Sequence, residues 1–307
     1  MAADTHEEIH FAAMGSEAHV IIHGAPAGLA ETARRRIEEL EALWSRFIPT
    51  SDVSRLNAAA IGEAVPVHPD TVTLVERAVD GWYASGGRFD PMLLADLERA
   101  GYDHSFRGPP AISTALPTVA EVTVSRSSAA TFDPGGLGKG LAADLVSAEL
   151  IEAGAVGVMV NLGGDLRVRG TAPDGGAWRI DVENPREPGS PPLATIVLSD
   201  GAVATTSRLK RHWVADGAER HHMIDPDTRE PATTPVIAAT VIAGEGWQAE
   251  VLAKVAFLDG FRSDEGLARI ERLGAAALIV TDDMEATTSR WDEFIAAPTG
   301  QPVGSAA

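Results

Sequence analysis

Apolar residues recur at helical spacing along the first part of the chain. From Leu29 onward, Ile37, Leu40, Trp44 and Phe47 follow at intervals of three or four residues, and charged residues fill the positions between them. This spacing predicts an amphipathic helix whose apolar side packs on a core.

A second helix of this kind is predicted over about residues 71–84. Asp70 stands where an N-cap is expected, and Gly86 with Gly87 ends the pattern. The predicted buried face consists of Val72, Val75, Val79 and Trp82.

Three further helices are predicted beyond residue 135. One begins after the glycine cluster at 135–140 and stops at Gly154. The other two cover about 247–258 and 267–273. The apolar side of the first is expected to carry Leu141, Leu145, Ala148 and Ile151.

Short runs rich in β-branched residues, separated by Gly, Pro, Asn and Asp, predict strands. They lie at 19–23, 156–161, 166–168, 178–182, 195–198, 202–205, 236–243 and 275–281. Residues 111–130 are small and polar and predict irregular structure with at most one edge strand near 122–125. Strands this close in sequence favour antiparallel pairing.

These elements predict one compact α+β unit of mainly antiparallel sheets flanked by helices, with room for two lobes around a cleft. We find neither an internal repeat nor a linker. Residues 1–13 are expected to form an N-terminal arm and residues 14–295 a single domain. The tail at 296–307, rich in Ala, Gly, Pro and Ser, is expected to be flexible.

The charge balance excludes one class of partner. The 307 residues are 45% apolar and 22% charged, which is typical of a globular protein. The 25 basic and 44 acidic side chains give 25 − 44 = −19. A field of this sign repels phosphodiester backbones and anionic lipid, so nucleic acid is not an expected partner.

Cysteine does not occur in the sequence, which excludes disulfides, iron–sulfur clusters and cysteine nucleophiles. The first residues lack the basic and apolar regions of a secretion signal. No apolar run approaches the roughly 20 residues that span a bilayer. These features predict a cytoplasmic location without membrane insertion.

Four segments combine glycines or histidines with charged side chains. In 86–91, Asp90 either caps the next helix or meets the polar end of a bound ring, and the local pattern favours capping. In 132–140, consecutive glycines and Lys139 lead into a helix, which suits an anion at the helix N-terminus. A tight turn explains the same glycines, and their spacing is not that of a Walker loop.

The third segment, 160–166, carries Gly163 and Gly164 between two strands, which suits a hairpin turn as well as a ligand. In the fourth, His221 and His222 precede Asp225. Histidines near a carboxylate are typical of a general base with its orienting group, or of metal ligands. The S-x-x-K run at 207–210 lacks the companion motifs of serine acyltransferases.

In this order and with these separations, the segments resemble the ApbE family, the FAD:protein FMN transferases, over about residues 14–280. Each piece is weak alone, and the ordered set is specific. The pieces are Met14-Gly15-Ser16, 44–49 with 51–57, 87–91, 133–144, 160–165, Thr206-Ser207 and 222–226.

The resemblance implies an ApbE-like fold with a flavin-binding cleft. It also implies that FMN is transferred from FAD to a Ser or Thr hydroxyl of an acceptor protein, a flavoprotein subunit or domain, and that AMP is released. Magnesium is the implied metal. Attack on the flavin-side phosphate needs a base and cations that neutralise developing charge.

By position, the resemblance implies roles for particular residues. His222 is the implied base, and Asp225 orients its segment. The implied metal ligands are the carbonyl of Gly136 and the carboxylate of Glu250. The implied contacts with FAD come from Met14, Phe47, Arg88, Phe89, Asp90, Asp133, Lys139, Thr206 and Ile224.

One segment departs from the family pattern A-D-A-L-x-T, because this chain has Glu250 at the Asp position and Lys254 at the Thr position. Glu250 can still supply an oxygen. Protonated Lys254 cannot ligate a metal, and its ammonium can reach the place of the ion. Phe47, Arg208 and Arg229 also replace a common Tyr and two common glycines.

Two alternative functions use the same implied site. In an FAD pyrophosphatase, water replaces the acceptor hydroxyl and the products are FMN and AMP. A non-catalytic FAD-binding protein needs neither reaction, and Lys254 in the metal segment favours this alternative.

Overall fold

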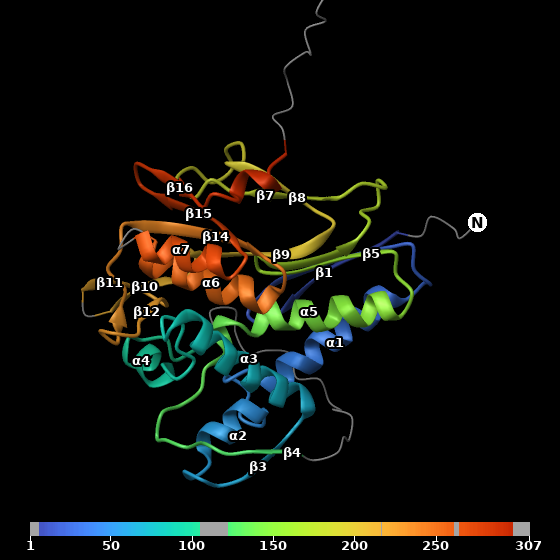
Figure 1. Ribbon diagram of the computed structural model, residues 1–307. Coiled ribbons are helices and arrows are strands. Elements are labelled where there is room, and N and C mark those ends of the chain that lie inside the picture. Colours follow the sequence, from blue (N-terminus) through green and yellow to red (C-terminus); the bar gives the residue numbers. More distant parts are fainter. Residues whose placement is uncertain (1–5, 105–121, 216, 261–263, 297–307) are drawn as a thin grey trace, which may run out of the picture.

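The computed structural model describes residues 6–104, 122–215, 217–260 and 264–296. Its largest element is one sheet in which every strand pair is antiparallel (Figure 1). The strands, in spatial order, are β1 (His6–Ala13), β2 (Ser16–His23), β5 (Gly157–Leu162), β6 (Asp165–Gly170), β9 (Asp200–Ser207), β14 (Val236–Ala243), β15 (Ala276–Thr281) and β16 (Glu285–Thr287).

Within the described residues, four two-stranded sheets accompany the large one. They are β3 (Val65–Val67) with β4 (Val122–Val124), β7 (Trp178–Val182) with β8 (Ala194–Leu198), β10 (His212–Ala215) with β11 (Ala218–His221), and β12 (Ile224–Asp225) with β13 (Glu230–Pro231).

The helices are α1 (Leu29–Trp44), α2 (Asp52–Ala58), α3 (Pro69–Ser85), α4 (Leu94–Arg99), α5 (Gly138–Glu152), α6 (Gly246–Asp259) and α7 (Asp264–Arg272). Short 3₁₀ turns, η1 (Pro134–Gly136) and η2 (Trp291–Phe294), complete the elements. Among the residues that the structure describes, no helix is both long enough and apolar enough to cross a bilayer.

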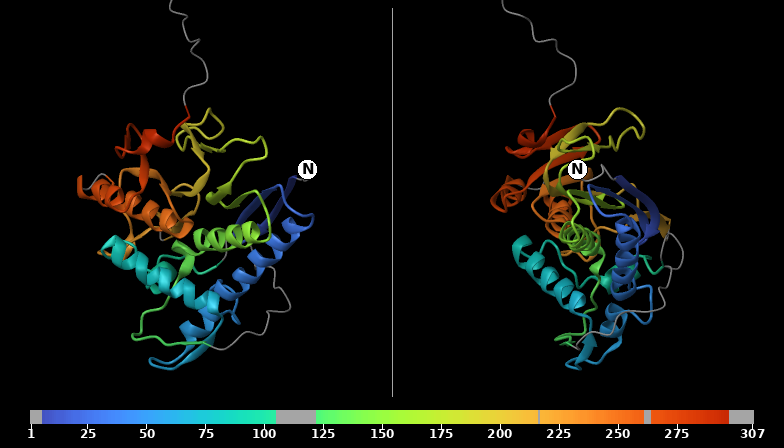
Figure 2. Two further views of the ribbon diagram at one scale, coloured as in Figure 1. Left: turned by 45° about the vertical axis from the view of Figure 1, so that its right-hand side comes forward. Right: turned by 90° about the vertical axis from the view of Figure 1, so that its right-hand side faces the viewer.

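The large sheet is covered on both faces. Helices α1, α5, α6 and α7 pack on one face, and β7, β8 and η2 pack on the other (Figures 1 and 2). All eight residues of β14 are buried, as expected for a strand covered on both sides. Helices α2, α3 and α4 with β3 and β4 form a second group beside this layered body (Figure 1). The predicted α+β class and antiparallel pairing are confirmed.

The N-terminal arm predicted from the sequence is partly a strand in the structure. Residues 6–13, expected within an arm, form β1 and pair with β2 at the edge of the large sheet. Residues 1–5 and 297–307 lie outside the described residues, as do 105–121 of the stretch expected to be irregular. The edge strand expected near 122–125 is β4.

The predicted buried face of α3 is wrong in its second half, whereas Val72 and Val75 are partly buried against the core as expected. Val79 and Trp82 are 47% and 42% exposed. The face that packs inward carries small residues, which let α3 approach α6: a Cβ at Gly81 would lie 3.1 Å from Val251 Cγ2. The buried residues are Thr71, Leu74, Ala78, Gly81 and Ser85.

Three predicted helix limits also shift. Helix α1 ends at Trp44, because Ser45 is already extended, and Phe47 lies beyond it. The N-cap of α3 is His68, whose ring accepts from the backbone N–H of Asp70. Helix α5 begins at Gly138, inside the glycine cluster. It packs against the sheet, α1 and α6, so it is buried on more than the single side expected.

Helices α5 and α6 cross where two glycines face each other. A Cβ at Gly140 would lie 2.3 Å from the carbonyl oxygen of Gly246, and a Cβ at Gly246 would lie 2.5 Å from that of Gly140. The carboxylate of Asp144, on α5, accepts from Gly246 N at 2.7 Å and Trp247 N at 3.0 Å. The crossing therefore caps α6 and sets its register against α5.

We expect Gly140→Ala to lower the free energy of unfolding by about 1–3 kcal/mol, because the added methyl meets backbone that cannot rotate away. The matched control is Gly138→Ala in the same helical turn, where the nearest atom to a new Cβ is Pro134 Cβ at 3.7 Å. That variant should match or exceed the wild type by up to about 1 kcal/mol, since Ala is the better helix former. Urea unfolding of both variants tests this expectation, and equal stabilities would contradict it.

Candidate functional site

A cleft of about 380 Å³ lies at the α5–α6 crossing. Its walls come from the β1–β2 turn, the end of α1, the segment after α3, the turn before α5, the segment around β10–β12, and α6. Segments far apart in sequence thus meet around one cavity.

The β1–β2 turn forms one lip of the cleft. Met14 and Gly15 both have positive φ, 50° and 66°, as a two-residue hairpin turn requires. The carboxylate of Glu41, on α1, accepts from both backbone N–H groups. Burial raises the pKa of Glu41, which these hydrogen bonds partly oppose. The apolar side chain of Met14 is therefore held at the cleft.

Aromatic rings line the wall after α1. The guanidinium of Arg46 lies 4.3 Å from the ring centre of Phe47 and 4.7 Å from that of Tyr102, and it donates to the Tyr102 carbonyl oxygen at 2.8 Å. Phe89 also lines the cleft and lies against Gly136, where a Cβ would come within 2.6 Å of the ring. The rings give this part of the cavity flat apolar surface.

Two aspartates shape the turns at the mouth of the cleft. Asp90 accepts from Met92 N at 2.8 Å and so stabilises the turn after α3. The expectation that it caps the next helix is wrong, because α4 begins at Leu94 and its N-cap position is Leu93. Asp133 accepts from Gly135 N at 3.0 Å and caps η1. Both aspartates also line the cleft, so each has a local structural contact and access to a ligand.

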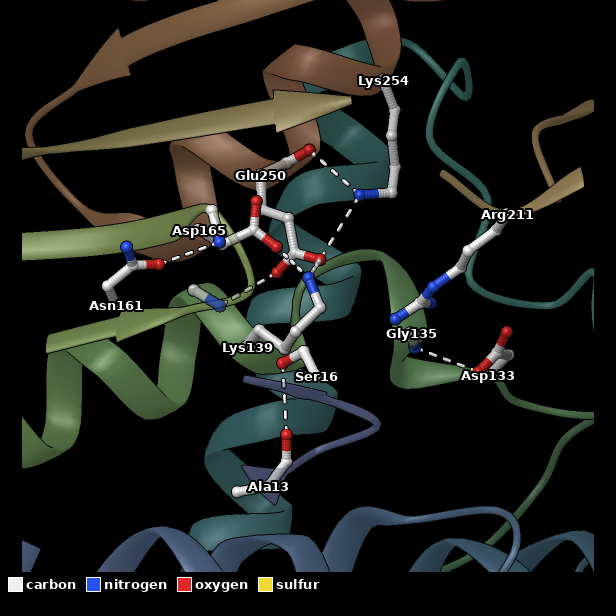
Figure 3. A network of polar contacts seen from close by, with 12 residues as sticks. Ala13, Ser16, Asp133, Gly135, Lys139, Asn161, Asp165, Arg211, Glu250 and Lys254 are labelled. Atoms are coloured by element: carbon white, nitrogen blue, oxygen red, sulfur yellow. Dashed lines mark hydrogen bonds and ion pairs between the residues drawn. The ribbon is translucent and has the colours of Figure 1, made fainter. Parts of the chain in front are cut away.

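A buried ion cluster forms the floor of the cleft (Figure 3). The ammonium of Lys139 pairs with the carboxylates of Asp165 and Glu250, the latter at 3.3 Å. Asp165 follows the Gly163–Gly164 hairpin turn, where both glycines have positive φ, so the hairpin alternative is confirmed. The second oxygen of Glu250 accepts from Gly140 N at 2.9 Å.

Burial dominates the ionisation of this cluster. Loss of solvation lowers the pKa of Lys139 to about 8 and also lowers that of Lys254. Burial by itself would raise the pKa of Glu250, but Lys139 and Lys254 together lower it below its usual range. The cluster is ionised, because two ammonium groups share the Glu250 carboxylate and favour its charged form.

The residues around Glu250 do not fit a divalent metal ion. Lys254, one turn further along α6, lies with its Nζ 3.4 Å from Glu250 Oε1 and 3.2 Å from the Glu250 carbonyl oxygen. Both carboxylate oxygens of Glu250 therefore already accept hydrogen bonds. The position at which the family pattern has a Thr oxygen is occupied by the ammonium group of Lys254. Divalent magnesium needs free oxygen ligands in near-octahedral geometry.

His222 is a titratable group that also lines the cleft. Its Nδ1 lies 3.4 Å from the carbonyl oxygen of Arg211, which only accepts, so Nδ1 is the protonated nitrogen and Nε2 keeps a lone pair. Burial, and then the charges of Arg211 and Lys254, hold the pKa of His222 well below its ordinary value. The imidazole is therefore neutral and able to accept a proton.

The neighbouring His221 has a different role. Its Nε2 contacts the Ala232 carbonyl oxygen at 3.1 Å, and its Nδ1 accepts from Met223 N at 3.2 Å. With both ring nitrogens engaged in holding the hairpin, His221 has no lone pair for a metal or a substrate. The two histidines are therefore not a paired metal site.

Asp225 contacts a guanidinium rather than His222. Its carboxylate lies 3.1 Å from Arg88 Nη1 and also accepts from Asp227 N at 3.0 Å. Arg88 is held further by Asp259 at 3.0 Å. These ion pairs raise the pKa of Arg88 although burial opposes its charge. They fasten the segment that carries His222 to the end of α3.

Most of the expected site residues line the cleft, and three do not. Among the described lining residues are Met14, Phe47, Arg88, Phe89, Asp90, Asp133, Gly136, Lys139, His222 and Ile224. Glu250 lies beneath Lys139, and Asp225 lies behind Arg88. Thr206 is buried in β9, opposite Ala239 of β14, away from the cavity lining.

Sequence reasoning missed several lining residues, notably Glu41, Arg46, Tyr102 and Arg211. Arg46 lies inside one of the segments that carry the resemblance, so its position was available. In the sequence, Glu41 is one of several polar positions of an amphipathic helix. Arg211 belongs to no motif that indicates a functional role. Their part in the site depends on contacts across the fold.

The cleft collects positive charge in an acidic chain. Lys139, Arg211 and Lys254 all line it. After burial, the nearby charge of Arg211 lowers the pKa of both lysines, and Lys254 also lowers that of Lys139. Rings and cations side by side suit a ligand with flat apolar parts and an anionic centre.

Comparison with known proteins agrees with this arrangement. The chain is 29% identical over 280 residues to the FAD:protein FMN transferase of Treponema pallidum, covering 82% of this chain and 77% of that protein. It is 26% identical over 267 residues to that of Vibrio cholerae serotype O1, covering 81% and 78%. The solved structure of Pseudomonas stutzeri flavinyl transferase ApbE, apo form, matches with a TM-score of 0.79 at 26% identity, over 96% of this chain and 98% of that one.

The sequence profile of the ApbE family matches residues 14–279, which is most of the chain. This match extends from the β1–β2 turn at the cleft to β15 of the large sheet. The chain therefore belongs to the ApbE family.

Proposed function

We propose that this chain is an FAD:protein FMN transferase, which moves FMN from FAD to a Ser or Thr hydroxyl of an acceptor protein. The observation that carries this proposal is the group of Lys139, Lys254 and Arg211 in a ring-lined cleft of a chain with net charge −19. Family membership and the names of the relatives support the same function.

The cleft suits the chemistry of FAD. The diphosphate is the anionic centre, and the cations with the glycine turn at 135–138 are the groups that bind it. Phe47, Phe89, Met14 and Ile224 offer apolar surface to the rings, and Asp90 and Asp133 offer acceptors to their polar edges.

The proposed reaction forms one bond and breaks one bond at phosphorus. The acceptor hydroxyl oxygen bonds to the flavin-side phosphorus, and the bond from that phosphorus to the bridging oxygen breaks. AMP leaves with the bridging oxygen, and the hydroxyl proton passes to Nε2 of His222. The cations neutralise charge that develops on the phosphate oxygens.

Asp225 is a positioning residue in this proposal. It acts through Arg88 and holds the His222 segment in place rather than touching the reacting atoms. A magnesium requirement, implied by the resemblance, is not part of the proposal because of the position of Lys254. The acceptor is a flavoprotein subunit or domain, and the cytoplasmic location stays a prediction.

The full chain, incubated with FAD and an acceptor that bears a Thr-containing target of the family's type, should add the mass of FMN to the acceptor and release AMP. Mass spectrometry of the acceptor and chromatography of the nucleotides measure both products. FMN and AMP without a modified acceptor would instead identify a pyrophosphatase. Bound FAD without any AMP would identify a binding protein.

Replacement of the base should separate binding from chemistry. We expect His222→Gln to slow FMN transfer roughly 10²–10⁴-fold, because general base catalysis contributes about that factor. FAD affinity should change little, since the substitution keeps a polar side chain of similar length. The exposed His212→Gln serves as the control with unchanged transfer, and a His222→Gln enzyme as fast as the wild type would contradict the role.

The pH dependence of kcat/KM gives a second test of the base. A folded-state pKa below the ordinary histidine value of 6.5 keeps His222 neutral as the pH falls through that value. We therefore expect kcat/KM, which reports the free enzyme, to hold through pH 6.5 and to decline only at lower pH. If kcat/KM instead falls on the acidic side with a midpoint at or above pH 6.5, His222 with its lowered pKa is not the base.

A further inference from the structure

Lys254 lies between the two residues that the family resemblance assigns to a metal ion. Its Nζ contacts Glu250 on one side, at 3.4 Å from Oε1. On the other side its methylenes pack on Gly136, where a Cβ would lie 3.0 Å from Lys254 Cε. The lysine side chain thus lies between Gly136 and Glu250, the two residues implied as metal ligands.

The lysine is held in this place. Its ammonium also donates to the Glu250 carbonyl oxygen at 3.2 Å, and its side chain is 14% exposed. The Glu250 carboxylate is 3% exposed and has a donor on each oxygen: Lys139 and Lys254 at Oε1, and Gly140 N at Oε2. A divalent ion bound here would have to displace an ammonium group and lie beside another.

Two side chains supply positive charge at the cleft without an added ion. Lys254 and Arg211 both line the cleft, and each lies near enough to Lys139 to affect its protonation. Together the two side chains carry the two positive charges that a divalent ion would bring. An ammonium and a guanidinium bind phosphate oxygens through charge-assisted hydrogen bonds.

We infer that this chain binds the diphosphate of FAD through the fixed ammonium of Lys254, with Arg211 beside it, and that its flavin site works without a divalent metal ion. This inference rests on the proposed function, because it names the group that meets the diphosphate in the same cleft. It differs from that function in predicting that divalent metal has no effect on FAD binding.

The test is equilibrium binding of FAD to the full chain, followed by flavin fluorescence, in EDTA and in excess MgCl₂. Wild-type affinity should be the same in both conditions. Lys254→Met, which keeps length and loses charge, should weaken binding roughly 10- to 100-fold in both, the usual effect of losing a hydrogen bond to a charged group. Lys254→Thr should bind weakly in EDTA and regain affinity with magnesium, because Thr restores an oxygen ligand beside Glu250.

Lys210→Met is the matched control. The sequence has three lysines, Lys139, Lys210 and Lys254, and Lys210 is exposed and is not among the described residues that line the cleft. This variant should bind FAD as the wild type does in both conditions. A loss as large as that of Lys254→Met would mean that net charge, not position, explains the effect, and would overturn the inference.

If a variant does not fold, FAD binding by the wild-type protein in EDTA and in MgCl₂ still decides the test. FAD binding that disappears in EDTA and returns with magnesium would overturn the inference and leave the proposed function intact. No FAD binding in either condition would overturn both. Binding of Mn²⁺ measured by electron paramagnetic resonance adds a readout independent of flavin: we expect no tight Mn²⁺ site in the wild type with FAD, and such a site would contradict the inference.

Discussion

The close contact of Gly140 with Gly246 is the constraint on which the site depends. Because neither residue has a side chain, α5 and α6 meet backbone to backbone, and Asp144 caps α6 across the contact. The same contact brings Gly140 N to 2.9 Å from the Glu250 carboxylate and Lys139 to 3.3 Å. The helices cannot separate without breaking the cap and the ion cluster together, so packing and site chemistry are coupled.

The ion cluster illustrates how burial and charge pairing oppose each other in a low-dielectric place. Lys139, Glu250 and Lys254 all lose solvation, which disfavours each charge alone. Their mutual pairing offsets this cost because the carboxylates of Glu250 and Asp165 each have an ammonium partner. A lysine on the chain is oriented during folding, whereas an ion must be captured from solution. A fixed charge of this kind is preorganised for an anionic ligand.

The two adjacent histidines show why contacts, rather than residue type, assign roles. His221 uses both ring nitrogens to hold the β11–β12 region. His222 has Nδ1 on the Arg211 carbonyl oxygen, lines the cleft and keeps its Nε2 lone pair. Asp225, the carboxylate nearest in sequence, instead binds Arg88 and anchors the segment. The base is thus oriented by the main-chain carbonyl of the residue that precedes β10.

The sequence by itself determined the α+β class, the antiparallel pairing and most helices and strands, because periodicity and turn residues act locally. The segments that meet at the cleft were identified by their resemblance to the ApbE family. The sequence did not determine which side of α3 is buried, since apolar Val79 and Trp82 suggest one face and the packing of Gly81 near Val251 requires another. Arg211 and Glu41 could not be found from local pattern, because their partners come from distant segments. Lys254 stood out as a departure from the family pattern, but only the tertiary structure decided its place between Gly136 and Glu250, since that place is set by the crossing of two helices about a hundred residues apart in the chain.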